Sequence, residues 1–184
     1  MTPQEALVGG FVIVVPTDTV YGLACLPDKP AAVTRIYEMK QRGRDLPLPV
    51  LCTDVRHASM YGRLPEWAGR GWPGALTLIV PRTMASVPWD IGDAPDSVAL
   101  RVPDHPLVQG LADELGPLAV TSANLHSMPT PETAEEVLDL FGEGVALAID
   151  GGSLAGRSST VIDCRGHRPR VVREGAVHLS ALLR

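Results

Sequence analysis

The segment VVPTDTVYGLACLP, residues 14–27, joins a buried-strand pattern to an unusually polar turn. Residues 11–15 are five apolar residues in succession, which is typical of a buried β-strand. Pro16 interrupts them, and two threonines around Asp18 follow before the sequence becomes apolar again. The segment therefore predicts a strand that is followed at its carboxyl end by hydroxyls and one carboxylate. What these polar groups contact has to be inferred from the rest of the chain.

Helical and strand patterns alternate along the rest of the chain. Helices are expected at 2–10, 30–41, part of 55–72, 105–115, 131–141 and 177–184, and strands at 11–15, 46–52, 75–80, 97–102, 117–122, 145–149, 159–164 and 170–172. Because some strands follow one another without a helix between them, the sheet is expected to be mixed. We expect an α/β fold, a single domain over residues 1–184 with a twisted mixed β-sheet flanked by helices.

The overall composition is that of an ordinary globular domain. The chain has 184 residues, 45% hydrophobic and 20% charged, and a domain of this size buries roughly 70% of its unfolded surface without a disulfide or metal. No apolar run approaches the roughly 20 residues of a membrane span, and the start does not resemble a secretory signal, so we expect a cytoplasmic protein without membrane contact. The three cysteines lack C-x-x-C spacing, so neither a zinc site nor a disulfide framework is expected.

A cationic cluster, MKQRGR, ends the helix expected at 30–41. Lys40, Arg42 and Arg44 lie within five residues, and the simpler interpretation is a solvated helix end whose cations complement the dipole. Lys40, however, lies four residues after Ile36 and continues the apolar stripe toward the protein body. A lysine in that position requires an anion, which favours a ligand-binding role for the cluster.

Polar residues also follow the strand expected at 117–122. The segment TSANLHSMPTP, residues 121–131, lies at that strand's carboxyl end, where open α/β sheets hold ligands. Capping of the next helix by Thr130 or Thr133 explains only one hydroxyl. The other polar side chains of the segment are left available for a ligand.

The remaining chemistry-bearing residues are arginines in strands. Arg101 in SVALRVPDHP and Arg173 in VVREG each face either solvent or a buried anion. The segment GGSLAGRS, residues 151–158, fits most of a phosphate-loop motif, but a strand pattern follows it, so we expect a glycine-rich turn. G-x-S-x-G, H-E-x-x-H and histidine pairs at metal-ligand spacing are all missing. Hydroxyls and guanidinium groups at strand ends suit the binding of a phosphorylated ligand better than a covalent intermediate.

Seven segments occur in a fixed order along residues 10–177: PTDTVYGL, KQRGRDLPLPVL, WPGALTLIV, SVALRVPDHP, TSAN with the following PTP, SSTVID and VVREGAV. Together they resemble the YrdC-like family of threonylcarbamoyl-adenylate synthases. Each segment alone is a weak signal, whereas seven collinear matches are highly specific. The resemblance is to the short form of the family, which lacks the extra carboxyl-terminal domain of longer members.

The resemblance implies a nucleotidyltransferase, a threonylcarbamoyl-AMP synthase. The amine of L-threonine combines with bicarbonate to give a carbamate, whose carboxylate attacks the α-phosphorus of ATP, and pyrophosphate leaves. Threonylcarbamoyl-AMP then passes to a separate tRNA threonylcarbamoyltransferase, which modifies the adenosine beside the anticodon. ATP is thus a substrate, and Mg²⁺ would be held mainly through its phosphates, so no protein metal site is expected.

The resemblance also assigns roles to individual residues. Lys40 and Arg42 are expected to be catalytic and to hold phosphates or the carbamate. Threonine is expected to contact Thr19, Arg101 and Ser159, so the hydroxyls of PTDT would line the amino-acid end of a cleft. The nucleotide is expected to contact Arg42, Ser97, Ser122, Thr130 and Arg173.

The chain departs from the family pattern at a few of these places. Gly43 and Arg44 follow Arg42 where many members have a proline next. Leu46 and Leu51 stand where many members carry a polar residue and a histidine, so the threonine pocket is expected to be drier or differently closed. Asp18 replaces a common glutamate, which is a mild change.

Two other functions remain open at this point. A non-catalytic RNA-binding module of the same fold would bind RNA weakly, but the net charge of −5 argues against a broadly basic nucleic-acid surface. Carbamoyl-adenylate chemistry, as in hydrogenase-maturation carbamoyltransferases, belongs to long chains with zinc-finger cysteines, which this sequence does not have. The synthase is the favoured interpretation.

Overall fold

The apolar run before PTDT forms an edge strand, β1, of an eight-stranded sheet. The computed structural model describes residues 1–183. The strand order is β1-β2-β6-β3-β5-β4-β7-β8. The β3–β5 and β4–β7 pairs are parallel and the other neighbouring pairs are antiparallel, so the expected mixed sheet is confirmed.

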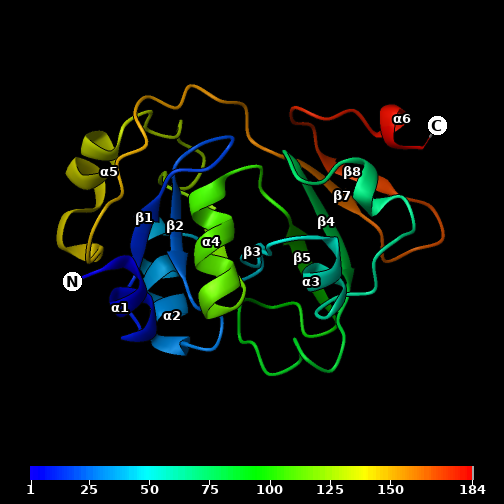
Figure 1. Ribbon diagram of the computed structural model, residues 1–184, viewed down its shortest axis with the longest axis horizontal. Helices are drawn as coiled ribbons and strands as arrows, with labels where there is room; N and C mark the ends of the chain where they lie inside the picture. Colours follow the sequence, from blue (N-terminus) through cyan, green and yellow to red (C-terminus); the bar gives the residue numbers. More distant parts are fainter. Residues whose placement is uncertain (184) are drawn as a thin grey trace.

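Figure 1 shows how the elements are arranged along the sheet. The strands are β1 Ile13–Val15, β2 Gly22–Cys25, β3 Val50–Leu51, β4 Leu76–Pro81, β5 Ser97–Arg101, β6 Leu118–Ser122, β7 Thr160–Asp163 and β8 Arg170–Arg173. The helices are α1 Pro3–Val8, α2 Pro30–Lys40, α3 Val55–Ser59, α4 Pro106–Leu115, α5 Ala134–Phe141 and α6 Leu179–Leu182, with 3-10 turns η1 Ala68–Arg70 and η2 Gly142–Gly144. Helices α1, α2 and α5 gather at the β1 end, and α6 lies at the β8 end. No helix within residues 1–183 is long and apolar enough to cross a membrane.

Several expected elements differ from the observed ones. The strand expected at 145–149 is wrong: this segment hydrogen-bonds to the chain around Val14 but forms only one isolated bridge, at Ala148. Strand β2 was not expected, because its four residues lack a clear strand pattern. The strand expected at 46–52 shrinks to Val50–Leu51, since its prolines cannot donate ladder hydrogen bonds. The helix expected within 55–72 consists of two short pieces, α3 and η1.

Alternate residues of the strands enter two different apolar cores. Ile13 and Val15 pack in the core that contains α1 and α4, whereas Val14 packs in the larger core that contains α2. In β4 and β5 the larger core receives Leu76, Leu78, Val98 and Leu100. The residues between them, such as Ile79 and Ala99, belong to neither core, so neither core covers that face of β4, β5 and β7. This uncovered face is where the candidate site lies.

The helix after the TSAN segment has a complete amino-terminal cap. The Thr133 hydroxyl accepts a hydrogen bond from the Glu136 amide at 3.2 Å, and the Glu136 carboxylate accepts one from the Thr133 amide at 3.2 Å. This reciprocal pair is a capping box. Of the two threonines considered from the sequence, Thr133 is therefore the cap, and Thr130 is not needed for it.

Removal of this cap should lower stability measurably. Thr133→Ala deletes the hydroxyl of the capping box, so we expect the free energy of unfolding to fall by about 1 kcal/mol. Thr130→Ala, the matched control outside the cap, should change it by no more than about 0.5 kcal/mol. Urea unfolding of both variants tests this, and equal losses would contradict the assignment of the cap.

Candidate active site

The uncovered sheet face forms the floor of a cavity of about 670 Å³. Thr77 and Ile79 of β4, Ala99 of β5 and Val161 of β7 line this floor with small or apolar side chains. The turn after β1, the loop after α2 and the loop after β6 supply the walls. A floor of this kind accommodates a ligand instead of a packing helix.

The cavity brings together most of the residues that the sequence singled out. Its lining includes Thr19, Lys40, Arg42, Ser97, Arg101, Ser122, Ser159 and Arg173. Thr130 is not among the lining residues; it is half-buried on the loop before α5. Leu46 and Leu51, the two departures from the family pattern, also line the cavity.

Lys40 is buried at the end of α2, as its position on the apolar stripe predicts, with 2% of its surface exposed. Its ammonium donates to the carbonyl oxygen of Ser122 and to two oxygens of Asn124, the carbonyl at 2.6 Å and the side-chain amide at 3.0 Å. Burial, and to a smaller extent the nearby Arg42 cation, together lower its pKa to about 7. Lys40 thus fixes the loop after β6 and adds positive charge to the cavity wall.

Arg42 follows two residues later, after Gln41 ends α2 in the left-handed conformation (φ 51°). Its Nη2 donates to the Leu46 carbonyl at 2.6 Å, and its Nη1 lies 3.4 Å from the Thr121 hydroxyl. Its Nε is buried and has no hydrogen-bond partner within the described chain. A buried donor without a partner is costly, so the protein's own contacts leave the guanidinium incompletely satisfied.

Arg101 is buried with 7% exposure and faces an anion, which settles the alternative that the sequence left open. Its Nη2 donates to the Asp18 carboxylate at 2.6 Å, its Nη1 to the Thr19 hydroxyl at 3.1 Å and its Nε to the Gly74 carbonyl at 3.1 Å. Arg101 and Thr19 line the cavity, whereas Asp18 does not. The polar turn after β1 therefore supplies both the hydroxyl beside Arg101 and the carboxylate that supports it.

A second hydroxyl and guanidinium group lie where β7 begins. The Ser159 hydroxyl lies 2.9 Å from that of Thr77, and Arg173 Nη2 donates to the Ser159 carbonyl at 2.9 Å and to its hydroxyl at 3.2 Å. Desolvation lowers the pKa of Arg173, and the Arg101 cation contributes in the same direction. The two arginines are thus close enough to repel each other, and an anion between them would relieve that repulsion.

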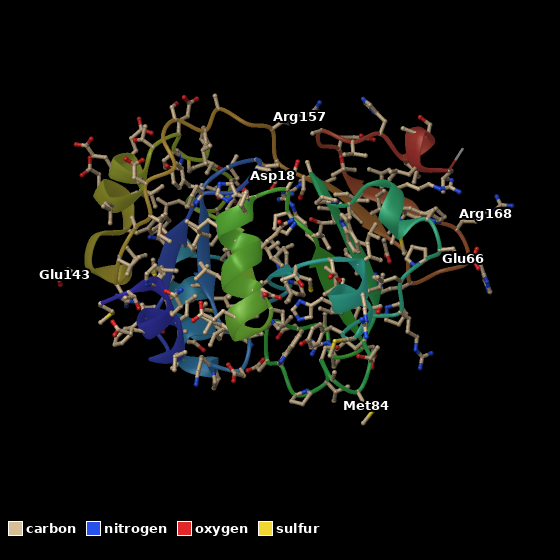
Figure 2. The ribbon with its side chains drawn as sticks, in the orientation of Figure 1. Asp18, Glu66, Met84, Glu143, Arg157 and Arg168 are labelled. Atoms are coloured by element: carbon tan, nitrogen blue, oxygen red, sulfur yellow. The ribbon has the colours of Figure 1, made fainter. Side chains whose placement is uncertain are left out.

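The segment with the partial phosphate-loop motif crosses above these residues. It runs without regular structure from Asp150 to Ser159 and passes along the upper edge of the molecule (Figure 1). The Tyr21 hydroxyl holds it, because that oxygen accepts from the Gly151 amide at 2.8 Å and donates to the Gly152 carbonyl at 2.7 Å. Figure 2 shows Asp18 beneath it and Arg157 projecting outward from it. The segment is a connection across the cleft and not a phosphate loop.

The cavity is cationic, and most of its cations have no carboxylate partner. Among carboxylates of the described residues, none lies within 4.0 Å of Lys40, Arg42 or Arg173, whereas Arg101 pairs with Asp18. Carbonyl and hydroxyl oxygens take the place of carboxylates. Such a set of groups suits the binding of a polyanion. The polyanion supplies the negative charge that the protein itself does not place beside these cations.

Sequence reasoning missed several lining residues and two supporting residues, Asp18 and Tyr37. Thr77 is a lone hydroxyl within the apolar strand ALTLIV, and its place between two core leucines is a signal that strand alternation could have used. Tyr37 lies behind Arg42 and does not line the cavity. Only a helical projection that placed Tyr37 beside Lys40 could have indicated this supporting role. Within the described chain, no group of three or more His, Cys, Asp or Glu residues could hold a metal ion.

Comparison with known proteins identifies the family. The Sua5/YciO/YrdC family model, described as telomere recombination, matches residues 5–175. The chain belongs to the Sua5/YciO/YrdC family. A Mycobacterium tuberculosis relative is 40% identical over 178 residues, which cover 94% of this chain and 82% of the relative. The threonylcarbamoyl-AMP synthase of Bacillus subtilis is 39% identical over 173 residues, which cover 90% of this chain and 50% of that protein.

Solved structures of family members have the same fold. Escherichia coli YciO superposes with a TM-score of 0.89 at 31% identity, over 97% of this chain and 90% of YciO. Pyrococcus abyssi Sua5, solved in complex with L-threonine, superposes with a TM-score of 0.83 at 33% identity. That match covers 96% of this chain and 54% of the Sua5 chain, so the present chain spans about half of Sua5.

Nucleotide binding at this cleft should take up a proton. A bound phosphate beside Lys40 favours its ammonium form and raises its pKa above the value of about 7, so at about pH 8 the neutral lysine should gain a proton. Calorimetric titration with a non-hydrolysable ATP analogue, in two buffers of different ionisation enthalpy, measures that uptake. Lys40→Met should abolish the buffer dependence. Equal binding enthalpies for the unmodified protein in both buffers would contradict a phosphate at Lys40.

Proposed function

We propose that this protein is a threonylcarbamoyl-AMP synthase, a nucleotidyltransferase that joins L-threonine, bicarbonate and ATP and releases pyrophosphate. The observation that carries the proposal is the cleft lined by three cations without carboxylate partners among the described residues: buried Lys40, half-buried Arg42 and the more exposed Arg173. Membership of a family with threonylcarbamoyl-AMP synthases among its members supports the same reaction. The product would serve tRNA modification beside the anticodon, through a downstream tRNA threonylcarbamoyltransferase in the cytoplasm.

The two ends of the cavity suit the two substrates. Arg101 and the hydroxyls of Thr19 and Ser159 form a cationic, hydroxyl-rich end that fits an amino acid's carboxylate and side-chain hydroxyl. Lys40 and Arg42 form the other end, where the loop after β6 adds Ser122. We assign threonine to the first end and the phosphates of ATP to the second.

The reaction needs alignment more than it needs a protein nucleophile. The carbamate formed from threonine and bicarbonate is itself the nucleophile, and its oxygen attacks the α-phosphorus while pyrophosphate leaves. The protein holds two anions in line and offsets the charge that develops on the leaving group, which is the work of Arg42 and Lys40. The three cysteines fit no thiol mechanism: burial raises the pKa of Cys25 and of Cys52 to about 12, and that of Cys164 to about 11.

The cavity also has oxygen donors that suit Mg²⁺ bound with ATP. The carboxylates of Asp45 and Asp93 line it, and Asp93 lies 3.8 Å from Arg44. Mg²⁺ would enter with ATP, held mainly by the phosphates and water that it prefers as ligands, and would supply further neutralisation of phosphate charge. The remaining steps are carried by the cations of the cleft.

The decisive assay is pyrophosphate release from ATP and Mg²⁺. Because the attacking carboxylate exists only when threonine and bicarbonate combine, release should require both. Mass spectrometry of the same mixture should detect threonylcarbamoyl-AMP. Equal release without threonine would overturn the synthase, and a salt-dependent RNA complex without any turnover would favour the RNA-binding module instead.

Arg42 offers the sharpest test of the phosphate end. Arg42→Ala removes a charge-assisted contact worth roughly 1.5–3 kcal/mol, so threonine-dependent turnover should fall about 10- to 100-fold. Arg42→Lys should restore only part of it, since an ammonium keeps the charge but loses the planar fork. Thermal melts of both variants control for folding. A folded Arg42→Ala protein with unchanged turnover would show that Arg42 only ends a helix.

A further inference from the structure

We propose that Tyr37 is a positioning residue that holds the Arg42 guanidinium in the cleft, through its ring and its hydroxyl separately. Tyr37 lies on α2, three residues before Lys40, and is 5% exposed. It does not line the cavity, so it cannot touch a substrate and must act through Arg42. The inference rests on the proposed function for the reaction in which the effect is measured.

The ring of Tyr37 is a platform for two cations. The Cζ atom of Arg42 lies 5.3 Å from the ring centroid, and that of Arg44 lies 5.0 Å from it. Both distances are within the roughly 6 Å over which an aromatic face attracts a guanidinium. The ring therefore stabilises the charge of Arg42 at a place where burial lowers its pKa.

The hydroxyl of Tyr37 acts on the other group that orients Arg42. It lies 2.8 Å from the Ile91 carbonyl and 3.1 Å from the Leu46 carbonyl, and can donate its single hydrogen to either. The Leu46 carbonyl is also the acceptor of the short bond from Arg42 Nη2. Tyr37 and Arg42 thus converge on one oxygen, and the phenol fixes the acceptor that sets the direction of the guanidinium.

The surrounding loops leave the phenol no other position. A Cβ atom on Gly92, which has φ of +133°, would lie 2.6 Å from the Tyr37 hydroxyl and 2.9 Å from the Arg44 carbonyl. The amide of Asp93 donates to that Arg44 carbonyl at 2.8 Å, and the Leu48 amide donates to the Ile91 carbonyl at 2.8 Å. The two loops are therefore closed around the hydroxyl and hold the ring against Arg42.

Arg42 depends on this support because it has few other contacts. Apart from the Leu46 carbonyl, its nearest hydrogen-bond partner is the Thr121 hydroxyl at 3.4 Å, and its Nε has no partner in the described chain. A long, flexible side chain that is held by one strong hydrogen bond becomes less preorganised when the aromatic ring beside it is removed. Loss of Tyr37 should thus weaken phosphate binding without removing any group that touches phosphate.

The test separates the ring from the hydroxyl. Tyr37→Phe keeps the ring and removes the hydroxyl, so the kcat/KM for ATP should fall about 3- to 10-fold. Tyr37→Leu removes the ring and the hydroxyl, so the kcat/KM for ATP should fall about 10- to 30-fold. The KM for threonine should stay within about 2-fold. Tyr61→Phe is the matched control, because that half-buried tyrosine stacks on Trp89 outside the cavity and should leave all constants unchanged.

The double variant with Arg42→Ala distinguishes positioning from general stability. If Tyr37 acts through Arg42, Tyr37→Phe should change kcat/KM by less than about 2-fold once Arg42 is alanine. A full effect in that background, or unchanged constants for both single variants, would overturn the inference. Should Tyr37→Leu not fold, the Phe variant carries the test alone.

The outcome can be separated from the proposed function itself. If the unmodified protein forms no threonylcarbamoyl-AMP, the synthase assignment fails. The Tyr37 and Arg42 variants can then be compared by the Kd of a non-hydrolysable ATP analogue, with the same expected ratios. Weakened analogue binding that depends on Arg42 would sustain the inference, and binding equal to that of the unmodified protein would refute it.

Discussion

The site depends on cations that have no carboxylate partners among the described residues. Lys40, Arg42 and Arg173 donate to carbonyl and hydroxyl oxygens, which leave their charge uncompensated. Burial lowers the pKa of each, so the unliganded protein carries an electrostatic cost that a polyanion relieves. The neighbouring loops supply those oxygens. Ser122, at the start of the loop after β6, accepts from Lys40, and Leu46, in the loop after α2, accepts from Arg42.

The sheet provides the space for this arrangement. Its alternating residues bury two cores, but only the larger core continues under β4, β5 and β7, and the opposite face stays open there. Small side chains such as Ala99 and Thr77 keep that face flat and accessible. The turn after β1 then brings Asp18 to Arg101, so this arginine has a carboxylate partner at the amino-acid end. At the other end, no carboxylate of the described residues lies within 4.0 Å of Lys40 or Arg42, which suits the binding of a triphosphate there.

Much of this could be predicted from the sequence, and the rest has identifiable causes. The mixed α/β sheet follows from the strand and helix patterns, and the eight lining residues follow from these patterns together with the family resemblance carried by segments such as PTDTVYGL. Strand β2 and the irregular course of 145–149 could not be predicted, because pairing partners distant in sequence decide them. The supporting roles of Asp18 and Tyr37 were also missed, because each depends on a contact between separate elements, Asp18 with Arg101 and Tyr37 with the 91–93 loop.

The most direct test is a crystal structure with L-threonine and a non-hydrolysable ATP analogue bound together. The account predicts the threonine carboxylate within hydrogen-bond distance of Arg101, and triphosphate oxygens within hydrogen-bond distance of the Arg42 guanidinium, which lines the cleft. It also predicts that the guanidinium of Arg42 stays over the Tyr37 ring when the phosphates bind. A nucleotide bound outside this cleft, or phosphates that make no contact with the Arg42 guanidinium, would contradict the account.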